Sequence, residues 1–139
     1  MNIKNLRRKI IYLLAIVTIF SSSAIAYASP SVVYYGGTIS NTSIQTFGPF
    51  SITNSNNVLT IAGWQESTAS NPRLIYKVIK NNFFNTELGT KIYDGNIPKS
   101  GTWYNYTFTG IPTNTNLKMR IEGGGIGTVN YAGNAYDGY

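Results

Sequence analysis

The chain has 139 residues, with 11 Lys and Arg against 5 Asp and Glu, and it contains neither Cys nor His. That length accommodates a single domain, and the missing residue types exclude disulfides, thiol catalysis, His-based triads and the usual zinc sites. Four cations lie among the first nine residues, so the remainder carries only seven cations against five anions. This near balance argues against a nucleic-acid-binding domain, which needs a basic stripe on its folded surface.

Residues 1–28 have the organisation of a secretory signal peptide. A charged segment over 1–9 precedes an apolar run over 10–20, three serines and two small-x-small sites. We expect cleavage after Ala28, with Ala26 as the second possible site, because Ser29-Pro30 cannot continue a helix. An uncleaved anchor is the alternative, but the apolar run is short of the roughly 20 residues that span a bilayer.

This leader predicts a signal helix over 1–28 and a single extracellular domain over 29–139. The product is expected to be secreted, with the membrane involved only during export. A small exported domain without Cys is more typical of bacteria than of eukaryotes, whose small secreted domains often rely on disulfides.

The chain after residue 28 predicts short strands joined by tight turns. It holds fourteen each of Gly, Asn and Thr, a composition that disfavours helix. Only 82–91 could form a helical turn. Alternating apolar and polar residues, bounded by turn residues, predict strands over 32–39, 43–52, 58–65, 73–80, 91–93, 102–109, 116–122 and 127–131. About eight strands at this spacing predict an all-β fold, either an antiparallel β-sandwich with Greek-key connections or a Greek-key barrel.

One segment resembles a known family. The residues Tyr-Thr-Phe-Thr-Gly-Ile-Pro at 106–112, followed by Leu-Lys-Met-Arg-Ile at 117–121, are similar to a strand–turn–strand segment of fibronectin type III sandwiches. The resemblance covers about 16 residues and departs from the family pattern at Asn116, where a Tyr is usual. It implies a fibronectin type III-like sandwich and carries no function.

Alternation also divides the predicted strands into core and solvent faces. Over 116–122 the apolar and charged residues occupy opposite faces, and over 102–109 most of the aromatic residues share one face. The expected core residues are Leu117, Met119, Ile121, Tyr104, Tyr106 and Phe108. The expected solvent-facing charges are Lys118, Arg120 and Glu122.

The outward face of 102–109 is the best candidate for binding. It carries Trp103, Asn105 and Thr107, and a Trp ring beside amide and hydroxyl groups can stack on a sugar while its neighbours form hydrogen bonds. Trp64 points outward as well, unless a bulge at Gly63 turns it inward. The alternative is that each Trp closes one end of the core.

The sequence offers few residues that could serve in catalysis or bind a metal or a cofactor. Glycoside hydrolysis needs two carboxylates about 5–10 Å apart, and nothing in the sequence brings Glu66 and Asp94 together. Asp94-Gly95-Asn96 lacks the remaining ligands of a calcium loop. The glycines over 123–127 lead into a strand, so they do not form the phosphate site of a helix N-terminus. We therefore expect no catalytic residue, metal or cofactor.

The sequence leaves three functions open. The first is a secreted, non-catalytic protein that binds a cell-surface polysaccharide or protein, or itself, through an aromatic and amide-rich sheet face. The second is a secreted antibacterial or membrane-active toxin, suggested by small size, mild basicity and many interfacial Tyr and Trp residues. The third, a small hydrolase, is disfavoured by the scarcity of carboxylates. No nucleic-acid partner is expected.

Overall fold

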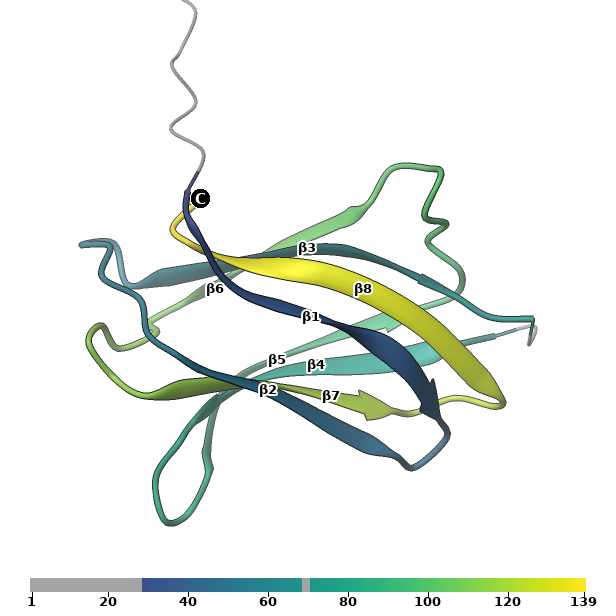
Figure 1. Ribbon diagram of the computed structural model, residues 1–139, viewed down its shortest axis with the longest axis horizontal. Coiled ribbons are helices and arrows are strands. Elements are labelled where there is room, and N and C mark those ends of the chain that lie inside the picture. The colour runs from purple at the N-terminus through teal and green to yellow at the C-terminus, as the bar shows by residue number, and fades with distance from the viewer. Residues whose placement is uncertain (1–28, 69–70) are drawn as a thin grey trace, which may run out of the picture.

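The computed structural model describes residues 29–68 and 71–139, which form eight strands (Figure 1). The predicted signal helix and its cleavage sites lie outside the described residues. The strands are β1 (Ser31–Ser40), β2 (Ile44–Phe50), β3 (Val58–Glu66), β4 (Arg73–Lys80), β5 (Thr86–Asp94), β6 (Tyr104–Thr109), β7 (Leu117–Gly123) and β8 (Thr128–Asp137). Among these residues no helix has the length and apolar character to cross a membrane.

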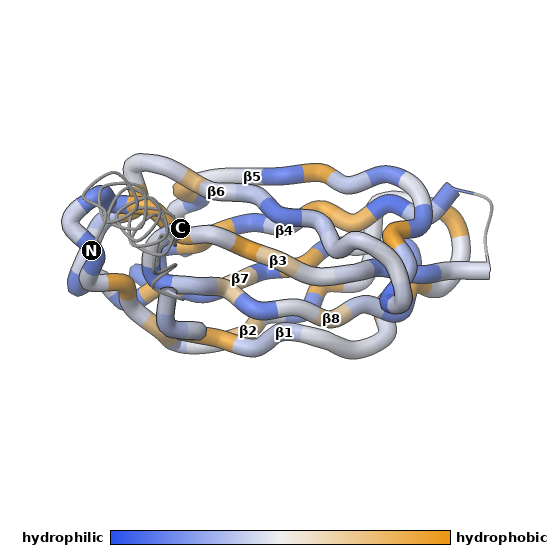
Figure 2. The backbone as a smooth tube through the Cα atoms, turned by 90° about the horizontal axis from the view of Figure 1, so that it is seen from above, coloured by the Kyte–Doolittle hydropathy of each residue, from blue (hydrophilic) through white to orange (hydrophobic). Residues whose placement is uncertain are grey.

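The strands form two four-stranded antiparallel sheets. Sheet A has the order β1-β8-β3-β6, and sheet B has the order β2-β7-β4-β5. The predicted all-β antiparallel sandwich of about eight strands is thereby confirmed. The two strands of the fibronectin-like segment, β6 and β7, lie in different sheets. Figure 2 shows the hydrophobic residues in short stretches along the strands, as alternation between an inner and an outer face requires.

Strands β5 and β8 are longer than predicted. Residues 86–94 form the continuous strand β5, whereas the sequence predicted a strand only over 91–93 and left 82–91 as the one segment that could form a helical turn. Asn82 closes the preceding hairpin turn by accepting a hydrogen bond from the Thr86 backbone N–H at 3.2 Å, and Asn85 adopts a positive φ. Strand β8 continues to Asp137 because its backbone pairs with β1 on one side and with β3 on the other beyond residue 131.

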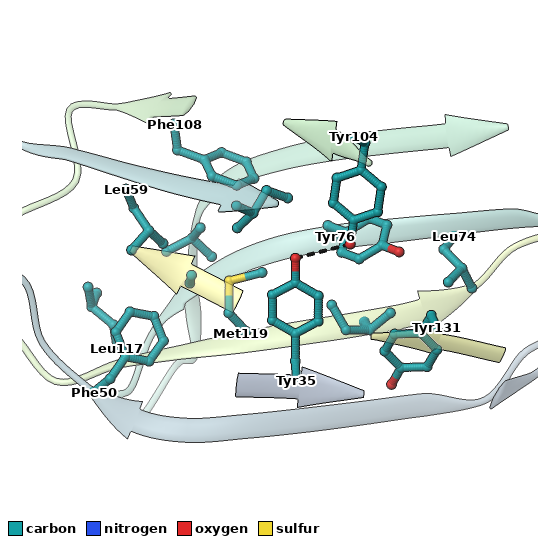
Figure 3. Packing of buried hydrophobic residues seen from close by; sticks show 14 of the residues in the cluster. Tyr35, Phe50, Leu59, Leu74, Tyr76, Tyr104, Phe108, Leu117, Met119 and Tyr131 are labelled. Carbon is teal, nitrogen blue, oxygen red and sulfur yellow. Dashed lines mark hydrogen bonds between the residues drawn. The ribbon is translucent and has the colours of Figure 1, made fainter. Parts of the chain in front are cut away.

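The core lies between the sheets and matches most of the predicted core residues. Leu117, Met119 and Ile121 are fully buried, and Tyr104 and Phe108 are nearly so (Figure 3). Tyr106 also packs against the core, but it is only half-buried because β6 is the edge strand of sheet A. Its ring packs edge-on against Phe108 and lies under the Lys91 ammonium at 4.8 Å.

Two glycines make room for a hydrogen-bonded tyrosine pair inside the core. Gly63 of β3 lies directly opposite Gly133 of β8, and a Cβ on either residue would lie 2.6 Å from a tyrosine hydroxyl. Those hydroxyls belong to Tyr104 and Tyr35, whose oxygens are 3.0 Å apart (Figure 3). The register of β3 is continuous through Gly63, so the bulge that would have turned Trp64 inward is absent from this strand.

The charges of β7 face outward, but Arg120 and Glu122 are not freely solvated as expected. Arg120 contacts Glu122 at 2.8 Å, and Glu122 contacts Lys77 of β4 at 3.2 Å. Lys77 also reaches Glu87 of β5 at 3.2 Å. These residues bury one another because β7 and β4 are neighbouring central strands of sheet B. The result is an ion-pair ladder across the outer surface of that sheet.

Candidate functional site

The outer surface of sheet A gathers all four residues predicted to bind. Because β3 pairs with β6, Thr60 lies opposite Thr107 and Ala62 lies opposite Asn105. Gly63 and Tyr104 form the next pair. Trp64 follows Gly63 and Trp103 precedes Tyr104, so the two tryptophans lie beyond the same end of this pairing. The sequence could not reveal this pairing, so it left open whether Trp64 belongs to the same surface. We call the outer surface of sheet A the neutral face.

Trp103 lies at the rim of the neutral face, one residue before β6 begins, and not inside a strand as predicted. The turn over 98–101 is closed by a 2.9 Å hydrogen bond from the Gly101 N–H to the Pro98 carbonyl, which delays the start of β6 to Tyr104. The indole Nε1 donates to the Lys99 carbonyl at 3.0 Å. This bond satisfies the polar end of the ring, while 42% of the residue remains exposed.

Lys99 connects the two tryptophans. Its ammonium lies 5.7 Å from the centroid of the Trp64 ring, within cation–π range, while its carbonyl accepts the bond from Trp103. Its backbone N–H donates to Glu66 Oε1 at 2.7 Å. Trp64 is therefore half-buried beneath a lysine side chain that a ligand could displace, whereas Trp103 is the more open ring.

Asn105 and Thr107 continue the neutral face along β6. The Thr107 hydroxyl lies 2.8 Å from that of Thr60, and Asn105 is exposed. A hollow of about 270 Å³ follows this part of the surface, lined by Ser29, Thr60, Ala62, Asn105, Tyr136 and Tyr139. Hydroxyl, amide and phenol groups thus surround a small apolar floor at Ala62.

Sequence reasoning missed the contribution of β8 and β1 to this surface. Asn130, Asn134 and Tyr136 project outward from β8, alternating with the buried Val129, Tyr131 and Ala135. On β1, Tyr34 is 65% exposed, and the Thr38 hydroxyl bonds to the Asn130 amide oxygen at 2.7 Å. The alternation over 128–136 was the signal available, although only the sheet order places it beside Trp64.

A second hollow, of about 370 Å³, lies at the end of β3 that carries Glu66. Its lining residues are Glu66, Ser67, Thr68, Asn96, Pro98 and Asn130. Asn96 holds this region together, because its side-chain oxygen accepts from the Ser67 N–H at 2.7 Å and its amide donates to the Ser67 carbonyl at 3.2 Å. The neutral face therefore carries hollows at both ends of its tryptophan pair.

Charge is distributed unequally between the two sheets. Nine of the twelve charged residues that follow residue 28 lie on strands of sheet B. Of the other three, Glu66 is at the end of β3, Lys99 is in the loop over Trp64, and Asp137 ends β8. The centre of the neutral face thus offers only uncharged hydrogen-bonding groups and aromatic rings.

The two carboxylates considered for hydrolysis occupy different sheets. Glu66 ends β3 in sheet A and accepts the Lys99 N–H, whereas Asp94 ends β5 in sheet B and pairs with Arg73 at 2.5 Å. The hydrogen bond from Arg73 holds the pKa of Asp94 below its ordinary value, whereas a general acid needs a raised pKa. Among residues 29–68 and 71–139 no group of three or more acidic side chains could hold a metal ion.

Comparison with known proteins identifies a shared fold but assigns the chain to no family. No family model and no curated protein sequence matches the chain. A solved structure described as "CBM4 structure and function" superimposes with a TM-score of 0.52, at 14% identity over 81% of each chain. Another, "Family 16 Carbohydrate Binding Module-2", gives a TM-score of 0.40 at 12% identity, over 69% of this chain and 71% of that one. The first likeness shows that the two-sheet sandwich is shared.

Proposed function

We propose that this protein is a secreted, non-catalytic module that binds a neutral polysaccharide on the neutral face. The observation that carries the proposal is that Trp64 and Trp103 lie at neighbouring positions of two paired strands, beside a sheet surface whose central groups are amides, hydroxyls and phenols. A pyranose ring has an apolar C–H face and a hydroxyl edge, so it matches an exposed indole flanked by uncharged hydrogen-bonding groups. Sharing a sandwich with a carbohydrate-binding module supports the proposal.

Charge distribution favours a neutral glycan over an acidic one. The strands of sheet B carry six cations against three anions, a net charge of +3, whereas the three charges elsewhere after residue 28 sum to −1. The one charge on β3 at this surface is the anionic Glu66. A polyanionic ligand would therefore find no cationic cluster on the neutral face. Binding that depends on stacking and neutral hydrogen bonds changes little with ionic strength, because salt screens interactions between charges.

The test compares the purified protein with Trp103→Ala in a pull-down on insoluble cellulose, chitin and β-1,3-glucan. We expect the wild type to bind at least one of these glycans equally well at low and high salt. We expect Trp103→Ala to lower that affinity at least tenfold, about 1.4 kcal/mol, with little change in the thermal midpoint. Trp103→Tyr, which keeps an aromatic ring, should retain most of the binding.

Ile92→Ala is the matched control for this experiment. Ile92 is 45% exposed on sheet B, close to the 42% of Trp103 on the other side of the sandwich. The Ile92→Ala variant should bind the same glycans as the wild type, with the same affinity. Unchanged glycan binding by Trp103→Ala contradicts the proposal, and so does a loss of several kcal/mol of stability, because Trp103 would then be a core residue.

Secretion is part of this proposal and rests on the leader sequence. N-terminal sequencing of the exported product should find Ser29 first. A soluble product that still carries the apolar run over 10–20 would contradict processing at Ala28 or Ala26.

A further inference from the structure

The tip of the β4–β5 hairpin exposes two adjacent phenylalanines. Phe83 is 94% exposed and Phe84 is 82% exposed, and their rings meet edge to face with centroids 5.2 Å apart. Figure 1 shows this hairpin projecting beyond the two sheets at the lower left. Fully burying a Phe side chain is worth about 1.5–3 kcal/mol, so two bare rings at one tip forgo a large stabilisation unless a partner covers them.

The turn that carries the rings is held by its own hydrogen bonds. The Asn85 N–H donates to the Asn82 carbonyl at 3.1 Å, and the Asn82 side chain bonds to the Thr86 backbone and hydroxyl. None of these bonds involves a phenylalanine side chain. Turn formation therefore explains the asparagines at this tip and leaves both aromatic residues unexplained.

Cations lie directly behind the tip. Lys80 ends β4, and Lys118 lies beside the hairpin because it pairs with Ile79. Within the described part of the chain neither lysine forms an ion pair, whereas the nearby Glu87 is engaged by Lys77. Lys118 also lines a hollow of about 270 Å³ at the base of the hairpin, together with Ile44 and Ile79.

We propose that this tip attaches the protein to an anionic lipid surface. A projecting aromatic pair enters the boundary between headgroups and acyl chains without needing a complementary groove, and cations behind it meet the anionic headgroups. The uncompensated positive charge selects an anionic bilayer over a neutral one. The inference goes beyond glycan binding, because the tip belongs to sheet B and shares no residue with the neutral face.

Vesicle cosedimentation tests the proposal with the purified protein. The two probes are vesicles of phosphatidylcholine alone and vesicles of an equimolar mixture with phosphatidylglycerol. We expect binding to the mixed vesicles and at least tenfold weaker binding to phosphatidylcholine. The double variant F83S/F84S should lose at least tenfold in affinity for the mixed vesicles, and K80Q/K118Q should bind them more weakly and with less salt dependence.

Ile126→Ser is the matched control. Ile126 is 79% exposed in the loop between β7 and β8, so its loss removes a comparable apolar surface elsewhere and should leave vesicle binding unchanged. All variants should keep the wild-type thermal midpoint, because the altered side chains are exposed or partly exposed. Equal binding by F83S/F84S, or no binding by the wild type, overturns the proposal. Concentration-dependent dimers that disappear in F83S/F84S, without vesicle binding, would assign the tip to a second copy and also overturn it.

Discussion

At the scale of single residues, the position of each side chain in its strand determines what it can do. Alternation correctly placed Trp64, Asn105 and Thr107 outward and Leu117, Met119 and Ile121 inward, because it depends only on neighbouring residues. It also placed Tyr106 inward, against the core, but could not show that this residue is only half-buried, because that depends on β6 being an edge strand. It also could not show Lys99 between the two tryptophans, because that contact requires a particular turn and the β3–β6 pairing.

The inward and outward positions of β7 should differ sharply in their effect on stability. Ile121→Ala should lower the free energy of unfolding by about 2–5 kcal/mol, because it leaves a cavity in a fully buried site. Lys118→Ala should change it by less than about 0.5 kcal/mol, because Lys118 is only partly buried and forms no ion pair among the described residues. Urea titration of both variants measures the difference, and the opposite ranking would show that the strand is out of register by one residue.

At the scale of strands and turns, β8 is held at its end by a carboxylate. Asp137 accepts hydrogen bonds from the Thr53 N–H and hydroxyl at 2.8 and 2.7 Å, and from the Asn54 N–H at 3.0 Å. These bonds fasten the last strand of sheet A to the turn that precedes β3. This clamp could not be predicted, because its partners are more than 80 positions apart along the chain.

The hydrogen bonds to Asp137 should make the free energy of unfolding depend on pH in the acidic range. Partial burial opposes ionisation of Asp137, but the hydrogen bonds from Asn54 and Thr53 outweigh it and lower the pKa of the carboxyl. The folded-state pKa of Asp137 therefore lies below the unfolded value of about 3.9. The ionised carboxylate stabilises the fold fully above about pH 3.9, and this stabilisation is lost as the pH falls through the folded-state pKa. Asp137→Ala should cost about 1.5–3 kcal/mol at neutral pH.

Urea titrations at neutral pH and at about pH 3 check this prediction, because the unfolded carboxyl titrates near pH 3.9. The difference in the free energy of unfolding between wild type and Asp137→Ala should be smaller at about pH 3 than at neutral pH. Asp94→Ala is the control, because among the described residues its carboxylate bonds only to the exposed Arg73. An exposed ion pair contributes little to stability, so Asp94→Ala should cost much less than Asp137→Ala. If this difference stays constant with pH, the ionised form of Asp137 adds no more to stability than the protonated form.

At the scale of the whole molecule, the two sheets have different outer surfaces around a shared core. The number of strands and the sandwich could be predicted because alternation and turns recur along the chain. Sheet order could not, and that order brings β8 beside β3 and so completes the neutral face with Asn130, Asn134 and Tyr136. The core is unusual in its many phenols, which the sequence showed as a tyrosine count but could not locate.

Those buried phenols should make the fold unstable in alkali. Burial raises the pKa of Tyr35, Tyr76, Tyr104 and Tyr131 above the ordinary value. Stability from a raised pKa is fully present below the unfolded value of about 10 and is lost as pH rises above it, at about 1.4 kcal/mol per pH unit for each tyrosine. Four such residues should exhaust a typical stability of about 5–15 kcal/mol within a few pH units.

Circular dichroism and tyrosinate absorbance, followed together from neutral to strongly alkaline pH, measure this effect. The buried phenols should ionise in one cooperative step that coincides with unfolding. Gradual ionisation of all the tyrosines near pH 10, with the circular dichroism unchanged, would contradict the burial described here.

The pairing of β1 with β8 has a consequence for the timing of folding. Strand β8, the last of the eight, lies between β1 and β3, so sheet A cannot close until nearly the entire chain is available. Such long-range pairings make all-β domains fold in about milliseconds to seconds. Without β8, the strands β1 and β3 would each lack the partner that lies between them. The availability of β8 therefore sets the moment at which sheet A can form.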